Sequence, residues 1–136
     1  MKHVILTVVA SIYSSMLIAQ VLEVSPAFPT VNDVVTITYD ATQGNGALTG
    51  QSQIYAHAGL ITSASTSPSN WQYVQGTWGT VDPQVAMTNI GNNKHTITID
   101  IDQFYGYPLA TTTVLKLAFV FRTANGSIVG RAADGG

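Results

Sequence analysis

Apolar and polar residues alternate in several short runs of this chain, and the alternation predicts β-strands. The clearest runs are residues 35–39, 54–58, 97–101 and 115–121. Successive side chains of a strand point to opposite faces, so each run has one apolar face to bury. Weaker runs, which bring the total to seven or eight strands, are 21–25, 71–74, 84–88 and 127–130. Helical character is limited to a single turn around residues 102–105.

Turn-forming residues separate these runs. Pro26 and Pro29 divide the first run from the second, and Gly44-Asn45-Gly46 and Gly91-Asn92-Asn93 precede later runs. Asn125-Gly126 predicts a tight hairpin before the last run, because both residues tolerate a positive φ. Strands separated by turns at this spacing predict an all-β fold, specifically an immunoglobulin-like β-sandwich of antiparallel strands.

The first twenty residues have the layout of a secretory signal peptide. A short basic start precedes an almost wholly apolar or small segment at 4–18, and Leu17 and Ala19 suit the residues before a cleavage site. A transmembrane anchor is the alternative, but the run is shorter than the roughly 20 residues of a span and contains three serines. We therefore expect residues 1–20 to be removed and residues 21–136 to form one secreted, extracellular or cell-surface domain, without membrane association.

The charge of the chain indicates an uncharged ligand. Charged residues make up only 9% of the sequence, and the formal net charge is −2. The few cations are spread along the chain, which does not suit nucleic acid or an anionic membrane as partner. There is no cysteine, so the core must hold the fold without disulfides. A neutral surface rich in Thr, Ser, Asn, Gln and Gly fits an extracellular protein that faces neutral ligands.

The sequence offers little for catalysis. Asp100 and Asp102 are two residues apart, and we interpret them as solvated carboxylates at a strand end, with calcium binding left open. His57 and His95 are the histidines of the mature chain; neither lies in a nucleophile motif, and two histidines without cysteine do not suit a zinc site. We expect no metal site, no cofactor and no enzymatic activity in this chain alone.

The aromatic residues are the more informative feature. Tyr55 and His57 share the face of their run opposite the small apolar residues, and Trp71 and Tyr73 are likewise two apart. Trp78 follows shortly after, so both tryptophans lie close together in sequence. Aromatic rings stack on the C–H faces of sugars while polar neighbours bind the hydroxyls, so these five residues are the predicted glycan-binding site. The alternative is that one tryptophan belongs to the core of the sandwich.

Several of these residues together resemble a known group of proteins. The run Ile54-Tyr55-Ala56-His57, the following Trp71, and the strand at 115–122 with its Asn125-Gly126 turn resemble starch-binding carbohydrate-binding modules. They are also similar to the N-terminal immunoglobulin-like domain of secreted α-amylase-family glycoside hydrolases. The resemblance implies that Tyr55, His57 and Trp71 bind α-glucan polysaccharide, with Trp78 as a third wall and an attached catalytic domain as a further partner.

The chain departs from this pattern in two places. A long insert at 62–70 precedes Trp71, and the final strand expected after Gly135-Gly136 is not in the sequence, which favours a fragment or the first module of a longer protein. The leading expectation is a non-catalytic α-glucan (starch) binding module, at the N-terminal side of a secreted starch-degrading enzyme. A structural or protein-interaction sandwich without a glycan site is the alternative, and a hydrolase whose active site this chain merely borders is a third.

Overall fold

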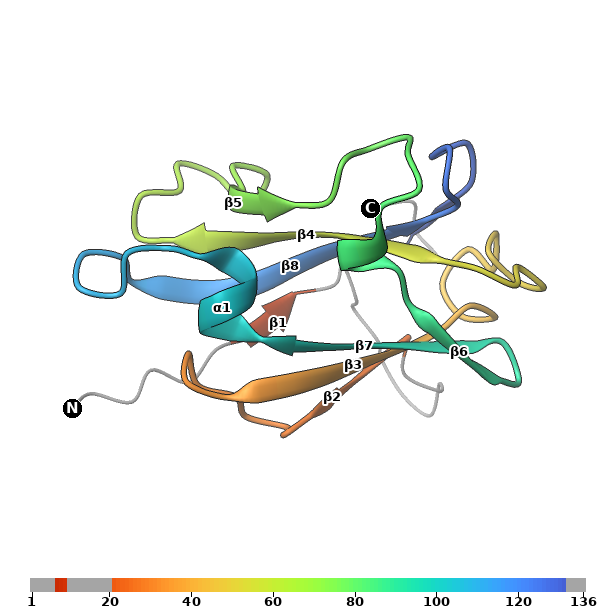
Figure 1. Cartoon of the computed structure of the whole chain (residues 1–136), viewed down its shortest axis with the longest axis horizontal. Coiled ribbons are helices and arrows are strands. Elements are labelled where there is room, and N and C mark those ends of the chain that lie inside the picture. Colours follow the sequence, from red (N-terminus) through yellow and green to blue (C-terminus); the bar gives the residue numbers. More distant parts are fainter. Residues whose placement is uncertain (1–6, 10–20, 132–136) are drawn as a thin grey trace.

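The computed structural model describes residues 7–9 and 21–131, which form two facing β-sheets (Figure 1). One sheet has the order β1-β8-β4-β5, with β9 also paired to β8; its strands are β1 (Thr7–Val9), β8 (Val114–Arg122), β4 (Tyr55–Thr62), β5 (Gln72–Gln75) and β9 (Val129–Gly130). The other has the order β2-β3-β7-β6; its strands are β2 (Leu22–Ser25), β3 (Val34–Asp40), β7 (Lys94–Asp100) and β6 (Thr88–Gly91). The predicted all-β sandwich is confirmed.

The pair β3 and β7 shows how the alternation specifies the fold. The two strands are antiparallel and in register from Val34 opposite Asp100 to Asp40 opposite Lys94. Every second residue points inward, and those side chains are buried: Val35, Ile37, Tyr39, Ile97 and Ile99. The threonines point outward, where the hydroxyls of Thr36 and Thr98 lie 2.9 Å apart across the strands. A slip of one residue would expose the whole apolar set, so burial fixes this register.

The core lies between the two sheets. β4 contributes small side chains, Ala56 and Ala58, opposite the bulky Phe119 and Phe121 of β8, so the layer fills without crowding. Tyr39 of the facing sheet stacks on Phe121 with ring centroids 4.3 Å apart. The outer face of β4 and β8 is therefore free for other side chains, and that face carries the candidate site.

Two sequence-based expectations fail locally, in both cases where a side-chain oxygen accepts a hydrogen bond from a backbone N–H. Residues 84–88, predicted as a strand, contain the 3₁₀ turn η1 (Pro83–Val85), because Asp82 caps it by accepting from the Gln84 amide. The Asn125-Gly126 hairpin is not a two-residue turn, since pairing of β8 with β9 stops at Arg122 and Val129. There the Asn125 side-chain oxygen accepts from the Ser127 backbone N–H, which favours a longer loop.

The predicted helical turn is confirmed as the short helix α1 (Ile101–Tyr105), which lies at one end of the sandwich (Figure 1). The Asp100 carboxylate accepts from the Gln103 amide at its start, and Gly106 ends it in the left-handed conformation at φ 60°. Within the described residues, no helix has the length and apolar character that crossing a membrane requires.

Strand β1 falls inside the segment expected to be a signal peptide. It pairs in parallel with β8, Thr7 opposite Lys116 and Val9 opposite Ala118, whereas the other strand pairs of the two sheets are antiparallel. The expected cleavage site after residues 19–20 and the polar run at 132–136 lie outside the described residues. The expectation of a cleaved leader therefore stays a prediction.

Candidate functional site

The outer face of β4 and β8 brings together the residues that the sequence singled out. The antiparallel register sets Tyr55 opposite Arg122, His57 opposite Val120, and Gly59 opposite Ala118. The side chains of this face point away from the core, because their neighbours Ala56 and Ala58 point into it. Two segments from outside the two strands place a tryptophan beside this face, one at Trp71 and the other at Trp78.

Trp71 lies directly on the backbone of Gly59. A Cβ built on Gly59 would be 2.9 Å from the Trp71 Cβ, so only glycine lets the indole approach the sheet this closely. The indole N–H donates to the Pro68 carbonyl at 3.2 Å, which ties Trp71 to the 62–70 insert. The insert that departs from the resembled pattern is thus the segment that helps to position this ring.

A groove of about 320 Å³ runs beside the Trp71 indole. The Ser/Thr-rich insert forms one wall and the outward side chains of β8 the other; its lining is mostly apolar with hydroxyls, from Ser65, Thr66, Ser67, Pro68, Lys116, Ala118 and Val120 among others. This combination is complementary to a sugar ring, whose C–H face packs on apolar surface while its hydroxyls bond to neighbouring hydroxyl groups.

His57 lies between the two tryptophans. Its ring centroid is 6.1 Å from that of Trp71, with the planes inclined by 29°, and 5.4 Å from that of Trp78, edge to face at 89°. Burial and the positive charge of Arg122 lower the pKa of His57, against a smaller opposing effect of the Gly76 backbone. The imidazole is therefore neutral at pH 7, and its buried Nδ1 has no hydrogen-bond partner within the described residues.

Trp78 is the most accessible ring of the group. It is 46% exposed, yet it is held on several sides. Gly126 of the β8–β9 loop packs against the indole so closely that a Cβ there would lie 2.5 Å from Nε1. The guanidinium of Arg122 lies 5.4 Å from the ring centroid, within cation–π distance. Trp78 is thus a fixed aromatic surface that faces solvent.

Arg122 organises this face, and sequence reasoning missed it. Its side chain is fully buried at the end of β8, and within the described part of the chain its guanidinium donates to four backbone carbonyls: Thr77, Thr80, Thr123 and Ala124, at 2.7–3.2 Å. These bonds fix the Trp78 loop and the β8–β9 loop. Burial lowers its pKa while Asp82 raises it, and an arginine keeps its charge in proteins. The sequence feature that could have pointed to a buried Arg122 is its position as a single charged residue directly after the apolar run 117–121.

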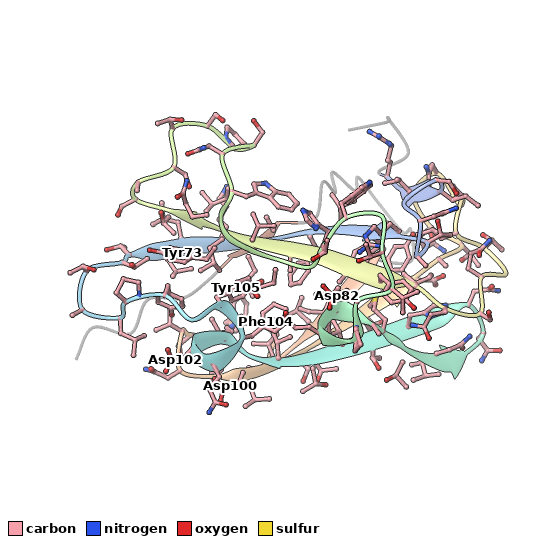
Figure 2. All side chains as sticks on the ribbon, turned by 45° about the horizontal axis from the view of Figure 1, so that its top comes forward. Tyr73, Asp82, Asp100, Asp102, Phe104 and Tyr105 are labelled. Atoms are coloured by element: carbon pink, nitrogen blue, oxygen red, sulfur yellow. The ribbon has the colours of Figure 1, made fainter. Side chains whose placement is uncertain are left out.

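Two of the five predicted binding residues are placed differently from the expectation. Tyr55 lies on the outer face, but it is only 7% exposed, because Arg122 covers its ring at 5.4 Å. Tyr73 does not share a face with Trp71, since its φ of 51° breaks the alternation of β5. It packs instead near Tyr107, with ring centroids 6.0 Å apart, close to α1 (Figure 2). Trp71, His57 and Trp78 remain together, and we call these three residues the aromatic strip.

The other candidates lie apart from the aromatic strip. Asp100 and Asp102 are at the start of α1, at the end of the sandwich (Figure 2), where Asp100 caps the helix. Among the described residues, no group of three or more His, Asp or Glu side chains is placed to hold a metal ion. His95 is fully buried in β7 of the other sheet, and burial lowers its pKa.

Comparison with known proteins places the chain in a family. A search of curated proteins finds no match. Residues 22–129, which span β2 to the first residue of β9, match the family described as a domain of unknown function, DUF8578. The match covers most of the chain and nearly the whole sandwich, so the protein belongs to the DUF8578 family.

Proposed function

We propose that this domain binds α-glucan without catalysing a reaction on it, and that the aromatic strip is its binding surface. The observation that carries the proposal is the arrangement of Trp71 and Trp78 on either side of a neutral His57, on one face of the sandwich. The exposed part of Trp78 and the groove beside Trp71 are open to a ligand from solvent.

The chemistry of the strip suits a neutral sugar chain. Each indole buries the C–H face of one sugar ring, which contributes about 1–2 kcal/mol by the area removed from water. The imidazole and the hydroxyls of Ser65 and Thr66 are partners for sugar hydroxyls at the rim. Two such contacts give weak affinity after the cost of association, and a polymer with repeated units compensates for this by avidity.

The choice of α-glucan rests on the resemblance of the Tyr55-Ala56-His57 run and Trp71 to starch-binding modules. The expected secretory leader fits this, because polysaccharides are degraded outside the cell. In this account the domain is an accessory module next to a catalytic domain, and it keeps that domain on its insoluble or polymeric substrate.

A structural or protein-interaction role remains the competing proposal. It expects both indoles to be sealed inside the sandwich and inaccessible. Trp78 is 46% exposed and Trp71 is partly buried on an outer face, so the accessible aromatic surface supports the glycan proposal instead.

Affinity electrophoresis in native gels tests the proposal. We expect soluble starch in the gel to retard the wild-type protein, single changes Trp71→Ala and Trp78→Ala to reduce the retardation, and the double change to abolish it. Tyr73→Ala is the matched control, since it removes an exposed aromatic ring outside the aromatic strip. Equal mobility of the wild-type protein with and without starch, or undiminished retardation of the double variant, would contradict the proposal. Gels with xylan or hydroxyethyl cellulose test the preference for α-glucan.

A further inference from the structure

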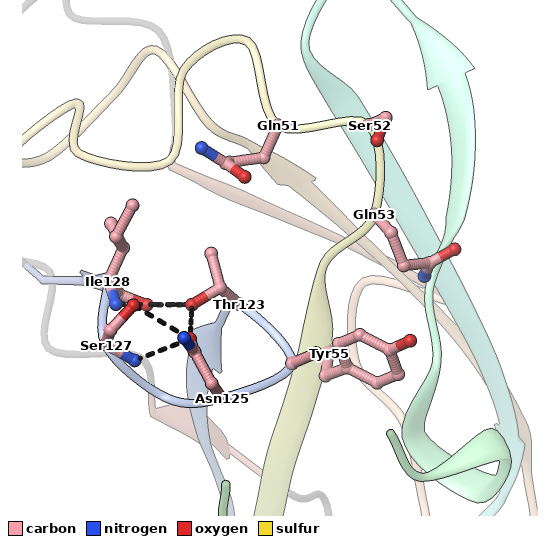
Figure 3. Close-up of a pocket in the computed structure, with 9 residues that line it drawn as sticks. Gln51, Ser52, Gln53, Tyr55, Thr123, Asn125, Ser127 and Ile128 are labelled. Atoms are coloured by element: carbon pink, nitrogen blue, oxygen red, sulfur yellow. Dashed lines mark hydrogen bonds between the residues drawn. The ribbon is translucent and has the colours of Figure 1, made fainter. Parts of the chain in front are cut away.

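A second pocket lies on the other side of the β8–β9 loop from Trp78. The segment before β4 forms one wall, with Gln51, Ser52 and Gln53, and Tyr55 lines it below them; the loop 123–128 forms the opposite wall (Figure 3). Its volume is about 490 Å³, within the range of small-molecule sites. Tyr55 is not part of the aromatic strip, because Arg122 covers its ring, but it is one of the residues that line this pocket.

The lining carries no ionisable group other than the Tyr55 phenol. Its remaining residues are neutral, with side-chain amides and hydroxyls beside the apolar Ala124 and Ile128. The nearby Arg122 guanidinium already donates to Ala124 and Thr123 carbonyls, so it is not directed to a ligand here. A phosphate or carboxylate would find no charge partner in the pocket, whereas a neutral polar ligand loses nothing by entering it.

The pocket offers donors and acceptors that are already oriented. The Asn125 side-chain oxygen accepts from Ser127 N, Ser127 Oγ and Thr123 Oγ1 at 3.1, 2.8 and 3.0 Å, which fixes the amide and leaves Nδ2 as a donor. The Gln53 amide nitrogen donates to the Ile54 and Met87 carbonyls, which holds the segment before β4 in place. Within the described residues, no hydrogen bond uses the side chain of Gln51. The Asn125 amide is held in place in advance and loses little entropy when a ligand binds, whereas the Gln51 amide has both its donors and its acceptor available.

From this geometry we infer that the pocket is a second binding site, which takes one neutral hexose unit through its hydroxyls. Side-chain amides, hydroxyls and the lack of charged side chains are together the chemistry of neutral sugar recognition. The site is separate from the aromatic strip and does not depend on the strip binding glycan. The two are neighbours, because the Asn125-Gly126 turn lines the pocket on one side and packs on Trp78 on the other.

The inference is tested by titrating the Trp71→Ala, Trp78→Ala double variant with maltose. The readout is the set of side-chain amide signals in ¹H–¹⁵N NMR spectra. We expect the Gln51 and Asn125 amide signals to shift and saturate, and those of the exposed Gln103 on α1 to stay in place. Adding Gln51→Leu should raise the dissociation constant about tenfold, as the loss of one or two hydrogen bonds predicts. Inorganic phosphate should cause no shift.

Three results would overturn the inference: no shift of the Gln51 and Asn125 signals, shifts of equal size at Gln103, or an Asn125 response unaffected by Gln51→Leu. Because the double variant lacks both indoles, these results concern only the pocket. Failure of the aromatic strip appears separately, as unaltered mobility of the wild-type protein in starch gels.

Discussion

Trp78 packs against Gly126, and the contact leaves no room for any side chain at that position. A Cβ on Gly126 would lie 2.5 Å from the indole nitrogen and 2.9 Å from the neighbouring ring carbon Cε2. Gly126 also has a φ of 70°, a conformation that other residues rarely adopt. The hairpin loop therefore serves as the support that holds an exposed tryptophan on the outer face of the sheet.

Gly126→Ala should therefore displace Trp78 as well as strain the loop. We expect a loss of about 1–2 kcal/mol from the positive φ, and an indole that is more accessible than in the wild-type protein. Acrylamide quenching measures this accessibility in a Trp71→Phe background, where Trp78 is the only tryptophan. Gly106→Ala is the control, since Gly106 has a φ of 60° but no atom within 4 Å of the new methyl group. Unchanged quenching in Gly126→Ala would show that the contact does not hold the indole.

Gly59→Ala tests how Trp71 is seated, without strain from a positive φ. The new methyl group would meet the Cβ and Cε3 of Trp71 at 2.9 and 3.0 Å, so the indole must move off the sheet. We expect about a tenfold weaker affinity for maltoheptaose by isothermal calorimetry. In a Trp71→Gly background, which removes the Cβ as well as the indole, the same change should have almost no further effect on the affinity, because the clash is gone. Independent, additive losses would contradict a direct contact between these two residues.

Arg122→Leu should destabilise the fold more than any surface change. The substitution leaves the carbonyls of Thr80 and Ala124 without their donor, and we expect a loss of about 2–4 kcal/mol in the free energy of unfolding by urea. Arg131→Leu removes the same charge from an exposed position and should change stability little. If the two variants are equally stable, the buried guanidinium does not organise the loops.

Stability should fall on acidification because of His95. Burial lowers the pKa of this histidine below its usual 6.5, so the unfolded chain binds a proton that the folded chain resists. The folded state is thus fully stable above about pH 6.5 and loses stability as the pH falls below that value, until the folded pKa is passed. Urea unfolding between about pH 7.5 and pH 5 measures the slope, which His95→Met should reduce. An identical slope in the variant would assign the effect to other groups.

Residue alternation was sufficient to predict the sandwich, because one buried face fixes each strand. It placed Val35, Ile37 and Tyr39 in the core, and it put His57 on the outer face of β4, where the structure has it. These are consequences of local period-two patterning, which requires no knowledge of neighbouring strands.

The details of the site depend on contacts between distant residues, which alternation does not encode. Tyr55 is covered because Arg122, 67 residues later, is bonded to loop carbonyls above it. Tyr73 leaves the face of Trp71 because a single positive φ reverses its direction. The seating of Trp78 depends on Gly126, which the sequence presents only as a turn residue. Each of these requires the tertiary structure.

The most direct test of the account is whether an α-glucan contacts both indoles. The chain has two tryptophans, so its ¹H–¹⁵N spectrum contains two indole N–H signals, which Trp71→Phe assigns. With maltoheptaose, we predict that both signals shift together along one saturable curve, while cellohexaose leaves them in place. If neither signal moves, or if only one responds, the aromatic strip is not an α-glucan-binding surface.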